Sequence, residues 1–567
     1  MDAVCWQERA FDPSIRQALE GRGLSPILAR LLAARGLTAQ NVDAFFDPAL
    51  SRLAEATSLP GVAAAADVIL PFIVGRRKIV VFGDYDADGV CASAILVRTL
   101  RILGGVADAF IPERFTEGYG MTESSIARML SEHPDVALVI TVDNGITAVS
   151  EVATLKARGL TVVVTDHHLP GNEIPTVDAL VNPHIASASG CDGLCGAGVA
   201  FFLAAALAKE AAAQGLYAGG KFSGPLLVLA GIATVADLMP LTDQNRILVT
   251  QALAAFRLCA PVGLRELFDR TARRITPVAV RDFGFALAPR INAAGRMDTA
   301  RTAYDLLMTT DREEARHLAL RVDELNVKRK NAEQAMQEAV EAQVASYDGL
   351  PAVVARGVDW HPGVAGIVAA RIMELAHVPV AIVVGDHGSV RAPDGYNVHD
   401  ALAATAPVLL RFGGHAAAGG FTIRPGKYEA FADLFAAACA AQRAAVPSAA
   451  TITFDGWLEP SDLTLALYED IQRMEPFGEG NPEPRFGLRN VMFSDVRPIG
   501  IDGRHLTFAF VDRAIPRAVW WNHGSDVETL RKHDAARFDV MFAVQSSDYG
   551  GFGPSLELRL SAVRPSA

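Results

Sequence analysis

The segment IVVFGDYDADG (Ile79–Gly89) contains the pattern that decides the fold of this chain. Its first four residues, Ile79–Phe82, are apolar and too few for a helix, so they predict a short buried strand ended by a glycine. Three carboxylates follow at alternate positions: Asp84, Asp86 and Asp88. Like charges this close repel one another and are costly to bury, so the cluster requires a cation or hydrogen-bond donors.

An apolar run that ends in acidic residues recurs three times further along the chain. The three runs are ALVITVDNG (Ala137–Gly145), TVVVTDHH (Thr161–His168) and LAGIATVADLMPL (Leu229–Leu241). We interpret them as strands or strand-like segments, and the polar residues that they deliver are Asp143, Asp166, His167, His168 and Asp237. A lone aspartate after a strand is usually part of a turn or a helix cap. Their joint occurrence favours a metal site with more than one ion.

Composition limits the class of protein. The chain has 567 residues, of which half are hydrophobic and a fifth charged, as in soluble proteins with several domains. The longest apolar runs, Val199–Ala208 and Pro225–Ala236, are shorter than the roughly 20 residues of a membrane helix. The N-terminal residues contain no apolar signal core. We therefore expect a cytoplasmic protein that does not associate with membranes.

Charge and cysteine content add two expectations. The formal net charge of −12 argues against a nucleic-acid coat protein, but an enzyme that acts on nucleic acid is compatible with it because arginines and metal ions supply local positive charge. Six cysteines in a chain of this size do not predict a disulfide framework. We expect Cys191 and Cys195 to be reduced thiols in a glycine-rich loop and not zinc ligands.

The predicted fold class is α/β with a C-terminal β-domain. Strands alternate with helical patterns from Arg76 to about Asp243, which predicts βαβ units, a parallel sheet, and carboxylates beyond the C-terminal strand ends, where such sheets bind ligands. The predicted regions are a helical N-terminal region (1–75), a catalytic α/β domain (76–310), a connecting helix (311–346), a second α/β lobe (347–450) and an antiparallel β-barrel (451–567) that resembles the oligonucleotide-binding fold.

The acidic and imidazole residues predict a specific metal chemistry. Mixed carboxylate and imidazole ligation suits Mn²⁺ or Mg²⁺, and the imidazole favours Mn²⁺. In an extended segment Asp86 and Asp88 project the same way, whereas the adjacent His167 and His168 diverge, so that one binds metal and the other faces the substrate. Two such ions about 3.5–4 Å apart would activate a water molecule for in-line displacement at phosphorus.

The chain resembles a known family. GDYDADG, VDNG, TDHH and GIATVADLMPL match, in order, the four motifs of the DHH phosphoesterases. Five further segments resemble more narrowly the RecJ family of single-stranded-DNA-specific exonucleases: IPERFTEGYGM (Ile111–Met121), PRINAAGRM (Pro289–Met297), VDWHPGVAGIVAARI (Val358–Ile372), FGGHAAAGG (Phe412–Gly420) and MEPFGEGNPEPRF (Met474–Phe486). Nine ordered motifs extend this resemblance over almost the whole chain.

The resemblance implies a role for each residue of the site. The implied metal ligands are Asp86, Asp88, Asp143, His167 and Asp237, with Asp143 between two ions. Asp84 lies where relatives that cleave small phosphoesters place a histidine, and we include it among the candidate ligands. His168 matches the residue near the scissile phosphate, as a general acid or electrostatic stabiliser, and Asp166 would orient the histidine pair.

A second set of residues is implied to bind nucleic acid. This set contains Arg114, Tyr119, Asn292, Arg296, Ser389, Arg391, Gly413, Gly414 and His415. Ser389 and Arg391 would bind a terminal 5′ phosphate, and Arg114 and Tyr119 would supply a phosphate contact and a stacking surface. The alternatives are a surface ion pair for Arg296, a core position for Tyr119 and tight helix packing for the glycines. Val390 departs from the family pattern, which leaves the 5′-phosphate contacts open.

The implied function is metal-dependent 5′→3′ exonuclease activity on single-stranded DNA, in recombination and repair. The implied partners are single-stranded DNA, a helicase and a single-strand-binding protein, and we expect a monomer. Two alternatives remain at this point. One is a phosphodiesterase for short oligonucleotides or cyclic dinucleotides, or a pyrophosphatase. The other is a non-catalytic DNA-binding scaffold of replication that keeps the same fold.

Overall fold

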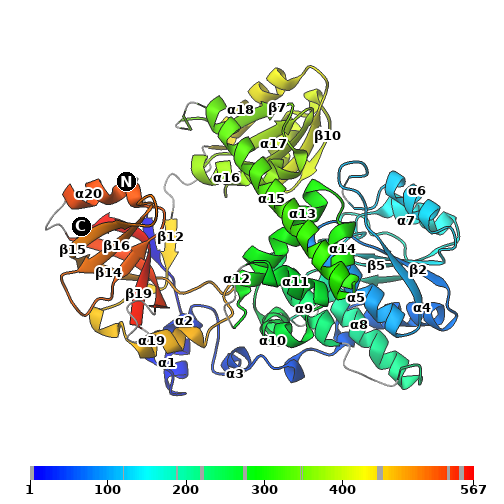
Figure 1. Ribbon diagram of the computed structural model, residues 1–567, viewed down its shortest axis with the longest axis horizontal. Coiled ribbons are helices and arrows are strands. Elements are labelled where there is room, and N and C mark those ends of the chain that lie inside the picture. The colour runs from blue at the N-terminus through cyan, green and yellow to red at the C-terminus, as the bar shows by residue number, and fades with distance from the viewer. Residues whose placement is uncertain are drawn as a thin grey trace. The chain divides into compact units, whose positions relative to one another are not determined.

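The computed structural model describes residues 5–118, 120–186, 190–217, 223–271, 277–344, 346–347, 349–443, 451–532, 537–547 and 555–566 (Figure 1). The chain divides into two compact units. The terminal unit contains Met1–Ala54, Leu238–Gln251 and Ala449–Ala567. The central unit contains Glu55–Asp237 and Ala252–Ser448. Each unit therefore combines segments that are far apart in the sequence.

The central unit is built on the predicted parallel sheet. Its five strands lie in the order β3-β2-β4-β5-β6 and all pair in parallel. They are β2 (Lys78–Phe82), β3 (Val106–Phe110), β4 (Leu138–Val142), β5 (Thr161–Thr165) and β6 (Ala179–Val181). The helices before, between and after these strands are α4 (Val62–Val74), α5 (Ala87–Ile102), α6 (Glu123–Glu132), α7 (Val149–Ala157), α8 (Gly196–Ala213) and α9 (Ser223–Ala236). Strands β2, β4 and β5 are almost fully buried, as the apolar runs predict.

Two local predictions near the acidic residues are wrong. The run Leu229–Leu241 is not strand-like, because its first part belongs to helix α9 and Asp237 follows the C-terminal end of that helix. Asp86 and Asp88 do not share an extended segment, because Asp86 is the N-cap of α5 and Asp88 lies in its first turn. A short buried helix has apolar residues on all sides, so its sequence does not differ in periodicity from a buried strand.

Helix α8 is long and apolar enough to span a membrane by length and composition alone, contrary to our expectation. Two bent helix pairs, Leu50–Ser58 with Val62–Val74 and Asp243–Cys259 with Val262–Asp269, would also meet this test as single spans. However, 67% of the tested α8 segment is buried within the protein. Helices α4, α5 and α9 pack around it. This packing accounts for its hydrophobicity.

The connecting helix and the second lobe complete the central unit. Helix α15 (Arg312–Gln343) corresponds to the predicted connecting helix (Figure 1). Helix α10 (Asp243–Cys259) begins in the terminal unit and ends in the central unit. The remaining helices before α15 are α11 (Val262–Asp269), α12 (Val280–Asp282), the π-helical turn η3 (Phe283–Leu287), α13 (Ala288–Met297) and α14 (Arg301–Met308). The second lobe is built on a sheet with the strand order β10-β11-β9-β8-β7, in which β7 and β8 pair in parallel and the other neighbours pair antiparallel. Its elements are β7 (Val353–Gly357), α16 (Ala365–Ala376), β8 (Val380–Val384), β9 (His387–Arg391), α17 (Val398–Ala404), β10 (Leu409–Gly414), β11 (Ala418–Ile423) and α18 (Tyr428–Arg443).

The terminal unit joins the two ends of the chain. Strand β1 (Cys5–Glu8) pairs in parallel with β12 (Thr451–Phe454), and α1 (Pro13–Glu20) and α2 (Pro26–Ala33) share a hydrophobic core with the C-terminal sheet. Helices α3 (Val42–Phe46), α19 (Leu465–Gln472) and α20 (Val527–Lys532) also belong to it. The predicted helical region 1–75 is thus divided, because residues up to Ala54 pack in this unit and α4 packs in the other.

The C-terminal sheet has the predicted antiparallel character. Its strands lie in the order β13-β14-β18-β19-β17-β16-β15, with parallel pairing only at β13–β14 and β17–β19. They are β13 (Gly456–Trp457), β14 (Phe486–Val491), β15 (Phe493–Ile499), β16 (His505–Phe510), β17 (Ala518–Trp520), β18 (Phe538–Ser547) and β19 (Ser555–Pro565). In the described part of the chain no pairing joins β13 to β15, so the predicted closure into a barrel is not seen.

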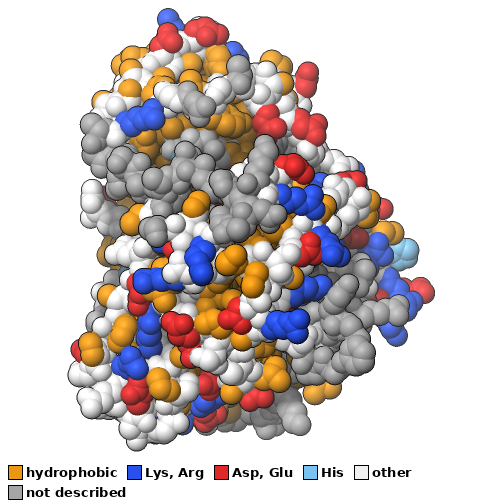
Figure 2. All heavy atoms as spheres, turned by 90° about the vertical axis from the view of Figure 1, so that its left-hand side faces the viewer, with side chains coloured by type: hydrophobic (Ala, Val, Ile, Leu, Met, Phe, Trp, Pro, Cys, Tyr) orange, Lys and Arg blue, Asp and Glu red, His pale blue; other side chains and the backbone are white. Residues whose placement is uncertain are grey.

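Charge is mixed on the face of the molecule shown in Figure 2. Lys and Arg side chains alternate there with Asp and Glu side chains and form no continuous basic surface. This agrees with a net charge of −12.

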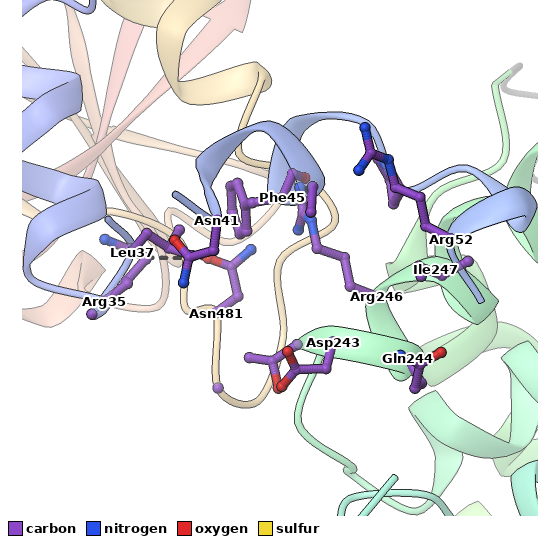
Figure 3. Close-up of a pocket in the computed structure, with 15 residues that line it drawn as sticks. Arg35, Leu37, Asn41, Phe45, Arg52, Asp243, Gln244, Arg246, Ile247 and Asn481 are labelled. Carbon is purple, nitrogen blue, oxygen red and sulfur yellow. Dashed lines mark hydrogen bonds between the residues drawn. The ribbon is translucent and has the colours of Figure 1, made fainter. Parts of the chain in front are cut away.

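A buried arginine ties together three distant segments of the terminal unit. A cavity of about 500 Å³ lies between residues 35–52, 242–247 and 480–481, and Arg246 extends across it toward Phe45 (Figure 3). Its guanidinium donates to the backbone carbonyls of Phe45 (2.8 Å), Met474 (3.2 Å) and Glu475 (2.6 Å). It also lies 3.7 Å from the centre of the Phe45 ring. Burial lowers the pKa of Arg246 to about 10.

Replacing Arg246 by Met should lower the free energy of unfolding of the terminal unit by about 2–4 kcal/mol, because three backbone carbonyls, those of Phe45 and Met474 buried, lose a charged donor. Urea unfolding followed by tryptophan fluorescence measures this, since four of the five tryptophans lie in that unit: Trp6, Trp457, Trp520 and Trp521. The control is Arg52→Met. Arg52 lines the same cavity but is exposed, with one ion pair to Asp47, so we expect a loss below about 1 kcal/mol. Equal losses in both variants would contradict this role of Arg246.

Candidate metal centre and anion site

Backbone N–H groups at two helix N-termini hold the acidic loop after β2. The side chain of Asp86 accepts hydrogen bonds from the backbone N–H groups of Asp88 and Gly89, both at 3.0 Å. The two carboxylate oxygens of Asp88 accept the N–H groups of Gly196 (2.6 Å) and Ala197 (2.7 Å), at the start of α8. The helix dipole favours negative charge at such a position. Asp88 therefore has a fixed orientation, set by a segment more than 100 residues away in the sequence.

Asp143 lies in a strained and tightly enclosed position. It follows β4 with a φ angle of +62°, a left-handed conformation that aspartate and asparagine tolerate better than most residues. The Cα of Gly196 lies against it, and a Cβ at that glycine would be 2.6 Å from the Cβ of Asp143. A side chain at position 196 would thus displace Asp143. This explains the need for glycine at the start of α8.

The histidine pair is held by Asp166. One oxygen of the Asp166 side chain accepts the N–H groups of His167 (2.8 Å) and His168 (3.1 Å) and lies 2.8 Å from Nδ1 of His168. Its other oxygen accepts the N–H of Ile146 at 2.9 Å. Nδ1 of His168 therefore donates to Asp166, which fixes the orientation of the imidazole. The His168 side chain is 44% exposed, whereas that of His167 is 9% exposed.

The buried His167 imidazole is the point at which three carboxylates meet. Its Nε2 lies 3.0 Å from Asp143, 3.7 Å from Asp237 and 3.8 Å from Asp88. The Oδ2 atom of Asp237 is buried and has no hydrogen-bond partner in the structure. A buried carboxylate oxygen without a donor is costly, and a cation would satisfy it. The structure thus brings together Asp143, His167 and Asp237 from two strand ends and one helix end.

The pKa values show how strongly these acids lack a counter-charge. Burial and the nearby Asp86 raise the pKa of Asp84 to about 8, and burial and Asp88 raise that of Asp237 to about 8. Burial raises the pKa of Asp143 well above its usual range, and the neighbouring acids add to this effect. Burial also lowers the pKa of His167, which keeps this imidazole neutral. Neutral imidazole and carboxylates short of positive charge are the groups that bind divalent cations.

For His168 and Asp166 the pKa values shift in the opposite directions to those of His167 and the other acids. Burial alone would lower the pKa of His168, but the hydrogen bond to Asp166 and its charge raise it to about 9. Burial alone would raise the pKa of Asp166, but the hydrogen bond and charge of His168, together with the backbone N–H groups of Ile146 and His168, outweigh burial and lower that pKa. The pair is therefore an ion pair at neutral pH. His168 carries a proton, as a general acid requires.

The predicted ligands fit divalent cations. Three groups of side chains place ligand atoms within 4.8 Å of one another: Asp143, His167 and His168; Asp88, His167 and Asp237; Asp84, Asp86 and Asp143. Asp143 and His167 each belong to two of these groups. Oxygen and imidazole donors of this kind suit Mn²⁺ and Mg²⁺. All six predicted metal residues, Asp84 included, thus converge, and so does His168.

Three predicted arginines gather beside the acids. Arg114, in the loop after β3, lies over the ring of Tyr85 at 5.0 Å from its centre. Burial and the charge of Arg114 lower the pKa of Arg296 to about 10, and the same two causes lower that of Arg391. In the described part of the chain none of the three forms an ion pair with a carboxylate. Clustered guanidinium groups without acidic partners are suited to bind phosphate.

Helix α13 links the arginines to the acidic loop. Asn292 was predicted to bind nucleic acid, but its side-chain oxygen accepts the backbone N–H of Ala87 at 2.8 Å. This residue therefore supports the loop that carries Asp86 and Asp88. Arg296, one turn later, donates to the carbonyl of Gly363 in the second lobe at 3.3 Å. The surface ion pair considered for Arg296 is not present.

The second lobe presents Ser389 and Arg391 on one face of strand β9. Val390, between them, points to the opposite face and is fully buried in the hydrophobic core. The departure from the family pattern at this position therefore leaves Ser389 and Arg391 free to act together. Ser389 pairs with Gly420, which pairs with Gly413, so the sheet beside Ser389 carries two residues without side chains.

The glycine-rich segment forms a hairpin between β10 and β11. The N–H of His415 donates to the carbonyl of Ala418 at 2.8 Å, and Gly414 has a φ angle of +141°. A Cβ at Gly413 would meet no atom within 4 Å, whereas one at Gly419 would contact α17. Helix packing thus explains Gly419, and Gly413, Gly414 and His415 remain exposed. Tyr119 lies outside the described residues.

Sequence patterns did not identify three contributors to this site. Tyr85 lies inside the acidic motif and contacts Arg114, and the backbone of Gly196 and Ala197 orients Asp88. The glycines of the segment Gly193–Gly198 are a weak signal for such a close backbone approach. Cys195 caps α8 and accepts the N–H of Gly198 at 3.4 Å, and Cys191 and Cys195 are free thiols.

Three known domain families match this chain. The DHH family N-terminal domain matches residues 78–222, the DHHA1 domain residues 349–441 and the RecJ OB domain residues 454–561. Proteins described as single-stranded-DNA-specific exonuclease RecJ are similar over most of the chain. The RecJ of Dickeya dadantii is 36% identical over 82% of this chain and 84% of that protein. The RecJ of Thermus thermophilus is 34% identical over 96% and 79%, respectively.

The chain is shorter than some relatives. The RecJ of Bacillus subtilis is 35% identical over 88% of this chain, which spans 63% of that protein. Solved structures agree with these matches. The crystal structure of Thermus thermophilus RecJ in complex with Mn²⁺ superimposes with a TM-score of 0.84 and 31% identity, over 99% of this chain and 80% of that chain. A complex of RecJ from the same organism with Mg²⁺ has a TM-score of 0.79 and 30% identity, over 99% and 79%. With domains, sequence and fold in agreement, the chain belongs to the RecJ family of single-stranded-DNA-specific exonucleases.

Proposed function

We propose that this protein is a 5′→3′ exonuclease that hydrolyses single-stranded DNA with two divalent metal ions, Mn²⁺ or Mg²⁺. The observation that carries this proposal is the meeting of six candidate metal ligands with three arginines that form no ion pair among the described residues. Acids and imidazole bind the cations, and the guanidinium groups bind phosphates of the substrate. The crystal structures of relatives in complex with Mn²⁺ and with Mg²⁺ support this choice of metal.

The chain's own residues divide the chemistry. When bound, the divalent ions would lower the pKa of a water molecule and neutralise charge on the scissile phosphate. The predicted metal residues would hold them: Asp84, Asp86, Asp88, Asp143, His167 and Asp237. His168, protonated and held through Nδ1 by Asp166, presents Nε2 to donate a proton to the departing 3′ oxygen. Asp166 would act as a positioning residue, because its side chain accepts hydrogen bonds from both histidines and from Ile146 and so orients the histidines.

The arginine cluster explains the proposed polarity. Arg391 and Ser389 of the second lobe, with Arg114 of the first, would bind the terminal 5′ phosphate of the strand. After burial, the charge of Arg114 is the second cause that lowers the pKa of Arg391, and Arg114 opposes part of the rise in the pKa of Asp84; both effects support an anion site beside the metal centre. A strand anchored by its 5′ phosphate would present its first phosphodiester to the metal ions, so that mononucleotides are released from the 5′ end.

The proposed role is in DNA recombination and repair in the cytoplasm. A duplex end would require a helicase to supply an unpaired strand, and a single-strand-binding protein would keep it unpaired. The RecJ OB domain match supports a binding surface for the strand outside the metal centre. We expect the protein to act as a monomer. A length series of single-stranded substrates separates this function from cleavage of short oligonucleotides or cyclic dinucleotides.

Replacing Asp143 by Asn should reduce Mn²⁺-dependent degradation of a 5′-phosphorylated single strand by more than about 100-fold. Asparagine tolerates the left-handed φ of this position, so the fold should persist. Affinity for the strand should change by less than about threefold, because the arginines are untouched. Gel assays with end-labelled strands measure activity, and fluorescence anisotropy measures binding. Activity that persists in this variant would contradict the proposed mechanism.

Replacing Arg391 by Gln should reduce kcat/KM for a 5′-phosphorylated strand by about 10- to 100-fold, the value of a charge-assisted hydrogen bond of roughly 1.5–3 kcal/mol. For the same strand with a 5′ hydroxyl, the substitution should reduce kcat/KM much less. The matched control is Arg411→Gln, an exposed arginine of the same sheet that donates to Thr422. Equal losses on both substrates would show that Arg391 does not bind the 5′ phosphate, and faster digestion from the 3′ end would contradict the polarity.

The acidic cluster should make stability depend on pH and metal in a defined way. Asp84 and Asp237 have pKa values of about 8 in the folded protein and about 3.9 when unfolded, so between these values the folded state binds more protons. The stability that these groups contribute at acidic pH is therefore lost as the pH rises toward 8. A divalent ion replaces the protons and removes this loss.

We therefore expect the increase of Tm on adding Mn²⁺ to EDTA-treated protein to be larger at pH 8 than at pH 6. Differential scanning calorimetry at both pH values measures it. In Asp143→Asn, removal of one buried negative charge should raise the Tm of the metal-free protein at pH 8 and abolish most of the Mn²⁺ effect. A Mn²⁺ effect of the same size at both pH values would show that the acids are ionised without metal.

A further inference from the structure

An exposed aromatic side chain stands directly beside the arginine cluster. Phe115 follows Arg114 in the loop after β3, and 46% of its surface is exposed. Arg114 itself lies over the ring of Tyr85, in the acidic motif. A phenylalanine ring in contact with water has an unfavourable hydration free energy that burial would remove. Because Phe115 is next to Arg114 in the chain, its exposed surface is a candidate for contact with a ligand that Arg114 binds.

Phe115 is exposed but not loosely held. Its ring meets the imidazole of His361 edge to face, with 5.6 Å between the ring centres and an angle of 84°. Such aromatic pairs contribute about 0.5–1.5 kcal/mol beyond the area they bury. Burial lowers the pKa of His361, so that the imidazole is neutral at pH 7 and acts as an aromatic partner. Phe115 belongs to the first lobe and His361 to the second, and the pair joins the two within the central unit.

A chain of contacts connects this pair to Arg296. Nδ1 of His361 accepts the N–H of Gly363 at 3.1 Å, and the carbonyl of Gly363 accepts a hydrogen bond from Arg296 at 3.3 Å. A Cβ at Gly363 would lie 2.0 Å from the backbone carbonyl oxygen of Arg296, so only glycine permits this approach. The orientation of the Phe115 ring is thus coupled to the arginine that faces the acidic loop.

We propose that Phe115 is the stacking surface for the base of the 5′-terminal nucleotide. This inference rests on the proposed function, because it assumes that the arginine cluster binds the 5′ phosphate. A nucleotide held by its phosphate at Arg114 would have its base within reach of the neighbouring residue, and Phe115 is an exposed aromatic side chain that directly follows Arg114 in the chain. Every base has a π face, so this contact tolerates any sequence.

The contact also favours an unpaired strand. A base that stacks on a protein side chain must leave the stack of its own duplex, and this costs a few kcal/mol when the base is paired. A single strand does not pay that cost. Phe115 and His361 would therefore contribute to selection of single-stranded over duplex ends at the first nucleotide.

The test compares Phe115→Ala on two 5′-phosphorylated strands that differ only in the first nucleotide, which carries either a normal base or an abasic tetrahydrofuran. On the normal strand we expect kcat/KM to fall by about 5- to 150-fold, mostly through KM. On the abasic strand the variant and the unchanged protein should differ by less than about twofold. Phe115→Trp should keep the preference for a normal base. Equal losses on both strands, or no loss on either, would overturn the proposal.

Phe285→Ala is the matched control. Phe285 is 77% exposed on the π-helical turn η3 of the same unit. Any effect of this variant should be the same on the normal and the abasic strand, since nothing places Phe285 next to Arg114. A loss confined to the normal strand in Phe285→Ala and absent in Phe115→Ala would assign the stacking surface to Phe285 and overturn the proposal.

A binding measurement separates this inference from the proposed function. The protein with Asp143→Asn is mixed with a 5′-phosphorylated strand whose first base is 2-aminopurine, and stacking quenches its fluorescence. We expect the Asp143→Asn protein to quench the fluorescence, and the double variant Asp143→Asn, Phe115→Ala to lose most of this quenching. Calorimetry checks that both variants are folded. Quenching without nuclease activity in the unchanged protein would contradict the function but support the stacking. Equal quenching in both variants would refute the stacking alone.

Discussion

The structure of the metal centre depends on the repulsion between buried carboxylates. Asp84, Asp86, Asp143 and Asp237 all have raised pKa values, because burial and neighbouring acids disfavour their charged forms. The protein offsets part of this cost by placing backbone N–H groups at the start of α5 and α8 against Asp86 and Asp88. The rest requires cations. Affinity for divalent metal is therefore a consequence of the same burial that fixes the geometry of the acids.

Positive charge is arranged as a complement to these acids. Helix α13 contributes to both sides, since Asn292 supports the acidic loop and Arg296 contacts Gly363 of the second lobe. The second lobe adds Arg391, and the loop after β3 adds Arg114. Divalent cations can neutralise a scissile phosphate, and guanidinium groups that bind a neighbouring phosphate fix the position of the strand. In this arrangement the spacing between metal centre and arginine cluster would decide which bond of the strand is cleaved.

Sequence patterns predicted some elements closely and missed others for physical reasons. The connecting helix predicted at 311–346 is α15 (Arg312–Gln343), because one stripe of its surface is apolar and buried and the rest is solvated. The segment before Asp237 was taken as strand-like, yet it is helix α9, whose surroundings are apolar on all sides. The side-chain oxygen of Asn292 accepts the backbone N–H of Ala87, a contact that the motif around Asn292 did not indicate. Such a contact between residues 205 positions apart leaves no local pattern.

The sequence by itself determined the parallel sheet, the acids and histidines at its edge and the family, because short buried runs, glycine turns and ordered motifs are local features of the chain. Only the tertiary structure decided that the N-terminal helices share a core with the C-terminal sheet, that Gly196 leaves room for Asp143 and that Phe115 meets His361. These contacts join residues far apart in the chain, where close packing sets distances that no local preference encodes.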